Sequence, residues 1–121
     1  MTPSAAARAV LRGWEQSDPE SVAALFTPDG VFEDPLQPRT RIGPEDIRAA
    51  CTGGMAAIRD CRIPVRLLIE QGQIAIVEAE FQSELATTGA RFDFPFMMVV
   101  EMKDGLIQRL SEYFDTGPLR K

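Results

Sequence analysis

The second half of the chain alternates between apolar and polar residues over four long stretches. Such alternation predicts β-strands, because successive side chains of a strand point to opposite faces of the sheet. Short runs that contain glycine separate the stretches and predict hairpin turns. We therefore predict an antiparallel meander of four strands over residues 63–70, 74–84, 91–102 and 106–115.

The first half of the chain has helical spacing instead. Apolar residues at intervals of three and four predict a first helix over 4–16. Residues 17–20, Ser-Asp-Pro-Glu, combine a capping side chain, a proline and an acid in the first turn, which is typical of a helix start. This second helix ends near Phe26, a short strand covers 31–34, and a third helix covers 43–53.

The order of these elements, with helices first and a meander second, indicates an α+β domain, because the apolar faces of both kinds of element must pack together. The chain has 121 residues, of which 45% are hydrophobic and 26% charged, an ordinary globular balance. We expect a single domain over residues 1–121.

The charge and hydropathy of the chain argue against several classes of partner. The net charge is -5 and the basic residues are scattered, whereas a nucleic-acid surface needs a clustered basic patch. No apolar run approaches the roughly 20 residues of a membrane-spanning helix, and the first residues lack the pattern of a signal peptide. We expect a cytoplasmic protein with no nucleic-acid or membrane partner.

The residue types that the chain lacks limit its chemistry. It has no histidine, and therefore no imidazole base and no histidine-dependent triad. Cys51 and Cys61 are too few for a disulfide framework and form no zinc pattern, so we expect free thiols and no metal. No glycine motif for a phosphate or a dinucleotide occurs, and we expect no cofactor. Any catalysis must rest on Asp and Glu.

Two aspartates lie at the ends of predicted strands. Asp115 ends the last strand before a Thr-Gly-Pro break, and Asp34 ends the short strand before a proline. Unbroken alternation places Asp115 on one face with Arg109 and Tyr113, and Glu112 on the opposite face. A carboxylate at such an end can point into a cavity, although a solvated turn residue has the same spacing.

The sequences Val-Phe-Glu-Asp-Pro at 31–35 and Glu-Tyr-Phe-Asp at 112–115, together with the order of elements, resemble the nuclear transport factor 2-like superfamily, and its SnoaL-like and ketosteroid-isomerase-like group in particular. The resemblance spans the whole chain. It implies a cone-shaped, cystatin-like α+β barrel, in which a curved, mixed and mostly antiparallel sheet wraps around about three N-terminal helices. It also implies an apolar pocket and a homodimer formed through the sheet.

The resemblance also implies roles for the two aspartates. Asp34 matches the general base of ketosteroid isomerases, but this chain lacks the tyrosine and the aspartate that stabilise the oxyanion there. The tyrosine would lie near Val10 and the aspartate at Met97 or Met98. Asp115 matches the base of SnoaL-like cyclases. Limonene epoxide hydrolases need an Arg-x-Asp pair on the second long strand, and the segment 77–81 has no arginine. No named reaction therefore has its complete set of residues.

Three hypotheses remain open. In the first, the protein is a cofactor-independent enzyme of isomerase, cyclase or hydrolase type, in which Asp115 or Asp34 abstracts a proton from a hydrophobic small molecule. Tyr113, Arg109 and Ser111 are then the candidate hydrogen-bond donors to the substrate.

In the second hypothesis the protein binds a small hydrophobic ligand without catalysis, and in the third it is a dimeric interaction module with a vestigial pocket. Large apolar side chains would form the walls of the ligand pocket: Trp14, Phe81, Phe96 and Met97. The fold alone does not separate these functions.

Overall fold

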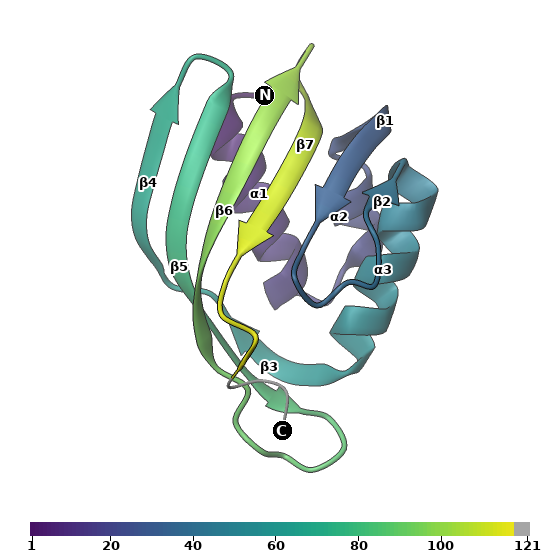
Figure 1. Ribbon diagram of the computed structural model, residues 1–121, viewed down its shortest axis with the longest axis vertical. Coiled ribbons are helices and arrows are strands. Elements are labelled where there is room, and N and C mark those ends of the chain that lie inside the picture. The colour runs from purple at the N-terminus through teal and green to yellow at the C-terminus, as the bar shows by residue number, and fades with distance from the viewer. Residues whose placement is uncertain (118–121) are drawn as a thin grey trace.

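A single sheet of seven strands curls around three helices in the computed structural model, which describes residues 1–117 (Figure 1). The helices are α1 (Pro3–Glu15), α2 (Pro19–Ala23) and α3 (Pro44–Ala56). The strands are β1 (Phe26–Glu33), β2 (Arg41–Ile42), β3 (Ile58–Arg62), β4 (Val65–Gln71), β5 (Ile74–Leu85), β6 (Phe94–Lys103) and β7 (Leu106–Tyr113).

The strands follow the order β2-β1-β7-β6-β5-β3, and β4 pairs with the other end of β5. Among the strands of residues 1–117, only the pairing of β1 with β7 is parallel. The result is a half-barrel with a mixed, mostly antiparallel sheet, which confirms the predicted α+β class and the cone-like architecture. None of the helices within residues 1–117 is long and apolar enough to cross a membrane.

The helices fill the concave side of the sheet. Thr2 caps α1 through a hydrogen bond from the Ala5 amide, and Pro3 occupies the first turn, where its missing N–H is not needed. The apolar face of α1 packs on β5 and β6, while α3 covers β1 and β2. The core is the layer between helices and sheet, and includes Ala7, Val10, Ile47, Cys51, Val77, Met98, Val100, Ile107 and Leu110.

A β-bulge in β7 decides which side chains face the core. Glu101 of β6 pairs with Arg109, but Met102 pairs with Ile107, so Gln108 has no partner on β6. The extra residue shifts the alternation by one position. Ile107 before the bulge and Leu110 beyond it are therefore both buried, although unbroken alternation places them on opposite faces, and Glu112 follows on the inner face.

Several element boundaries differ from the sequence-based prediction. β1 starts at Phe26 rather than at residue 31, because it pairs with β7 in parallel and the Ile107 amide donates to the Leu25 carbonyl at 2.7 Å. β2 and β3 were not predicted, since both are short and polar. The segment 91–93 was predicted as strand but precedes β6. Both cysteines are free thiols, as predicted.

Candidate functional site

A cavity of about 210 Å³ lies between the helices and the concave face of the sheet. Side chains from α1, from the end of α3 and from β5, β6 and β7 form its walls, and almost all are apolar. Its polar side chains are Asp34 and Gln37, from the loop between β1 and β2, and Glu112, from the end of β7. The remaining lining residues include Val10, Leu11, Trp14, Leu36, Ile58, Ile63, Leu85, Phe96 and Met98.

Six aromatic rings line the cavity, and Phe96 is one of them. The Phe81 ring stacks on Phe94 with a centroid separation of 5.1 Å and meets Trp14 edge-on at 6.1 Å. The Phe94 ring also contacts Phe114, with a centroid separation of 4.5 Å, and the Phe92 ring meets both Phe81 and Phe94 edge-on. Edge-on and offset contacts are the favourable arrangements for aromatic rings. The cluster gives the cavity an apolar wall of aromatic rings beside the two carboxyl groups.

The parallel pairing of β1 with β7 brings two carboxyl groups together. Glu33 of β1 lies opposite Ser111 of β7, so the next residues, Asp34 and Glu112, lie side by side. Their side chains share a hydrogen bond at the polar end of the cavity. Both residues are partly buried. Two acids in such contact cannot both be ionised without strong repulsion, so they hold one proton between them.

The surroundings of the two carboxyl groups assign that proton to Glu112. Burial raises the pKa of Glu112 well above its ordinary 4.5, and the nearby charge of Asp34 raises it further. Burial also raises the pKa of Asp34, but the Leu36 amide, which donates to Asp34 Oδ1 at 2.6 Å, and the hydrogen bond from Glu112 oppose this effect. Glu112 is therefore the protonated member, and Asp34 is a carboxylate with raised basicity.

The carboxyl pair also borders a second, more open depression of about 400 Å³ on the outer side of the same loop. Asp34, Gln37 and Glu112 line both spaces. The depression is polar, with Arg39 and Tyr113 among its lining residues. The proton-bearing groups thus lie at the boundary between an apolar interior and a polar surface.

Four of the residues that the sequence suggested for the site line the cavity. These are Asp34, Trp14, Phe81 and Phe96. Met97 and Tyr113 lie on the convex face of the sheet, with 43% and 56% of their surfaces exposed.

The other three suggested residues, Arg109, Ser111 and Asp115, also lie outside the cavity. Arg109 is exposed and forms an ion pair with Glu33 at 2.7 Å. Asp115 is exposed beyond the end of β7, and its Oδ1 accepts a hydrogen bond from the Gly117 amide at 2.9 Å. This is the local turn geometry that an aspartate before glycine readily adopts. The structure therefore brings Asp34 together with Glu112 and not with Asp115.

Glu112 was missed because the sequence-based alternation had no bulge. Counting from Ile107 in steps of two leads to Tyr113 and Asp115, whereas the residue added at Gln108 turns Glu112 inward. One signal was available in the sequence. Glu112 alternates with Leu110 and Phe114, and an acid between two large apolar residues is unusual on a solvated face.

The fold and the site can now be compared with known proteins. The family model of the SnoaL-like domain matches residues 7–110. The chain belongs to the SnoaL-like domain family. This membership confirms the resemblance predicted from the sequence, and it agrees with the curled sheet and enclosed cavity described above.

Solved structures share the fold of this SnoaL-like domain at low sequence identity. A protein from Catenulispora acidiphila with a ketosteroid isomerase-like fold, crystallised with trimethylamine, is 20% identical, with a TM-score of 0.84 over 95% of this chain and 88% of that one. An NTF2-like protein of unknown function from Burkholderia pseudomallei is 19% identical, with a TM-score of 0.85 over 98% and 95%.

An LEH-like epoxide hydrolase from M. tuberculosis is 19% identical, with a TM-score of 0.78 over 94% of this chain and 83% of that one. No curated protein matches the chain significantly. The structural relatives of the SnoaL-like domain thus include enzymes and uncharacterised proteins. At these identities the likeness shows a shared fold, and the reaction must be argued from the site.

Within residues 1–117 no group of three or more potential metal ligands occurs.

Proposed function

We propose that this SnoaL-like domain binds a small hydrophobic molecule in the cavity and moves a proton on it, as an isomerase or cyclase does. The observation that carries the proposal is the hydrogen-bonded pair of Asp34 and Glu112 at the end of an aromatic cavity. A carboxylate whose pKa is raised by desolvation is a stronger base than one in water, and the apolar walls favour a hydrophobic substrate.

Asp34 acts as the general base in this proposal. Its carboxylate takes a proton from a carbon next to a substrate carbonyl, and the electron pair of the broken C–H bond passes into the enolate. The proton on Asp34 then exchanges with solvent, and Asp34 delivers a proton to the same or another carbon, so that atoms and charge balance and no cofactor takes part. Glu112 keeps its own proton and donates it as a hydrogen bond to Asp34, which holds the base in one orientation.

Solvent deuterium exchange tests the proposal without knowledge of the substrate. Small cyclic ketones such as 2-tetralone, which carry acidic C–H groups, are incubated in D₂O, and exchange is followed by NMR. We expect the wild type to accelerate the exchange and Asp34→Asn to lower the enzymatic rate about 100-fold or more. Asp115→Asn serves as the comparison, because it removes the exposed aspartate. Equal rates in wild type and Asp34→Asn would contradict the proposal.

A second candidate function is binding without catalysis. A carboxylate beside aromatic rings suits a small alkylammonium ion, which pairs with Asp34 and places its methyl groups against Phe81 and Trp14. The C. acidiphila relative was crystallised with trimethylamine, an amine of this kind. If this function holds, trimethylammonium raises the melting temperature of the wild type and not of Asp34→Asn. The ketones are then bound without exchange.

The convex face of the sheet supports a further part of the proposal, a homodimer formed through the sheet. Apolar side chains lie next to one another across three strands on this face. Ile69 of β4 pairs with Ile76 of β5, which pairs with Val99 of β6. A continuous apolar surface of this kind is typical of an interface between subunits.

A further inference from the structure

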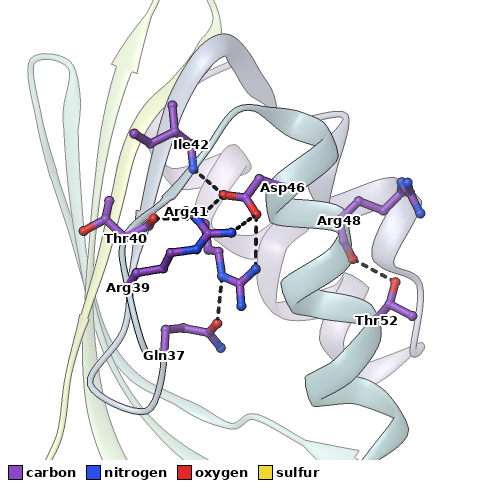
Figure 2. A network of polar contacts seen from close by, with 8 residues as sticks. All are labelled: Gln37, Arg39, Thr40, Arg41, Ile42, Asp46, Arg48 and Thr52. Carbon is purple, nitrogen blue, oxygen red and sulfur yellow. Dashed lines mark hydrogen bonds and ion pairs between the residues drawn. The ribbon is translucent and has the colours of Figure 1, made fainter.

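Gln37, in the loop between β1 and β2, lines the cavity beside Asp34 and Glu112, and a side chain behind it fixes its orientation. The Arg41 Nε donates a hydrogen bond to Gln37 Oε1 at 3.2 Å (Figure 2). A guanidinium group can only donate, so the amide oxygen must face Arg41 and the amide nitrogen must point away from it. Figure 2 shows this nitrogen on the side of Gln37 that is remote from Arg41.

Arg41 is in turn held by Asp46 in the first turn of α3. Arg41 Nη1 lies 3.1 Å from Asp46 Oδ1, and only 18% of the Arg41 side chain is exposed. Asp46 also accepts from the Ile42 amide at 3.0 Å and from both terminal nitrogens of Arg39, at 2.7 and 2.9 Å. These hydrogen bonds, with that from Arg39 the strongest, hold the pKa of Asp46 well below its ordinary value. The network anchors Gln37 to the end of a helix (Figure 2).

The Gln37 amide nitrogen is available to donate a hydrogen bond to a ligand. Among residues 1–117, no hydrogen bond involves Gln37 Nε2 as donor. The two carboxyl groups beside it cannot supply a donor to a substrate, because Asp34 is ionised and the proton of Glu112 is engaged with Asp34. When Asp34 removes a proton next to a carbonyl, negative charge develops on the carbonyl oxygen, and a fixed donor at that oxygen lowers the barrier.

We propose that Gln37 is the residue that binds the substrate oxygen, through its Nε2, while Arg41 and Asp46 are positioning residues that hold the amide in place. The inference rests on the proton-transfer function proposed above. It also narrows the substrate class. An aromatic cavity with one amide donor and one carboxylate at its end suits an apolar ring compound that bears a single carbonyl or phenolic oxygen near the reacting carbon.

Ligand binding tests this assignment without any catalysis. The probes are 2-naphthol and naphthalene, which differ only in the oxygen, and their dissociation constants are measured by fluorescence in the wild type and in Gln37→Met. We expect the wild type to prefer 2-naphthol. Gln37→Met keeps the length of the side chain but loses the donor, so the preference should fall about five- to tenfold while naphthalene binding stays unchanged.

Two arginine variants separate positioning from general stability. Arg41→Met releases the Gln37 amide and should lower the preference for 2-naphthol, whereas Arg39→Met removes a bond to the same Asp46 and should leave the preference unchanged. The proposal is overturned if the wild type shows no preference or if Gln37→Met retains it. This outcome is distinct from a failure of the proposed function, because loss of deuterium exchange in Asp34→Asn is measured independently of the naphthol preference.

Discussion

Glu112 makes the folded protein sensitive to pH in a defined direction. Its pKa in the folded state lies well above the ordinary 4.5, because burial and the charge of Asp34 both disfavour its ionised form. The folded state therefore keeps a proton that the unfolded chain releases. The stability linked to this group is fully present below pH 4.5 and is lost as the pH rises toward the folded-state pKa.

Replacing Glu112 by glutamine should remove this loss. The amide of Glu112→Gln still donates to Asp34 but carries no ionisable proton, so the free energy of unfolding should fall less with rising pH above 4.5 than in the wild type. Urea unfolding at several pH values measures the difference. Glu80→Gln, on the exposed side of β5, is the control and should follow the wild-type curve. A Glu112→Gln curve parallel to the wild type would contradict the assigned proton.

Asp34 and Asp115 differ at the residue scale in their surroundings rather than in their chemistry. Asp34 lies against an apolar cavity and another acid, whereas Asp115 lies in an exposed turn. We expect Asp115→Asn to change deuterium exchange of 2-tetralone less than twofold and Asp34→Asn to lower it about 100-fold. A larger loss in Asp115→Asn than in Asp34→Asn would favour Asp115, the base that the resemblance to SnoaL-like cyclases suggested.

Helix α3 carries two adjacent glycines near its end, and their surroundings predict opposite effects. A Cβ at Gly53 would meet nothing within 4 Å, whereas a Cβ at Gly54 would lie 2.8 Å from Trp14 Cη2. Gly53→Ala should stabilise the protein by about 0.5–1 kcal/mol through the higher helix propensity of alanine. Gly54→Ala should instead destabilise it by about 1–3 kcal/mol, because the rigid indole ring must move.

Ligand binding extends this prediction to the cavity. Trp14 and Gly54 both line the cavity, so a displaced indole should also weaken the binding of naphthalene in Gly54→Ala. Gly53→Ala should bind naphthalene with the same affinity as the wild type. Chemical unfolding and fluorescence titration of the two variants measure both effects. If Gly54→Ala gains stability and binds naphthalene normally, the indole is not a fixed wall of the cavity.

At the scale of elements, local patterns predicted the architecture but not the register. Alternation and helix-start signals located the three helices and the four strands of the meander, because these depend on neighbouring residues. The bulge at Gln108 depends on how β7 pairs with both β6 and β1. No pattern within β7 reveals that pairing, and one added residue exchanges Glu112 with Tyr113 between the inner and outer faces.

The same limit applies to the candidate site. Asp34 was found through its place at a strand end, and Trp14 and Phe81 through their size and spacing. Glu112 and Gln37 were not found, since both join the site through contacts between distant segments. Gln37 reaches the cavity from a loop, where no periodicity assigns a direction to a side chain.

The whole molecule presents an apolar surface on each side of its sheet. The concave side packs on the helices and encloses the cavity, while the convex side exposes large apolar residues to solvent. These are Leu67, Ile69, Ile74, Met97 and Tyr113. An exposed apolar surface of this extent is costly for an isolated domain, and association with a second copy would bury it on both subunits.

A single charge in the centre of this surface should therefore dissociate the proposed dimer. Ile69 is 50% exposed and pairs with Ile76 in the apolar row, so Ile69→Glu places a carboxylate in the interface core, where it loses hydration without a partner. We expect sedimentation velocity to show a dimer for the wild type at micromolar concentration and a folded monomer for Ile69→Glu. Ile42→Glu, which changes an exposed isoleucine on β2, should remain dimeric. A wild type that sediments as a monomer, or an Ile69→Glu variant that sediments as a dimer, would show that the convex face is not the interface.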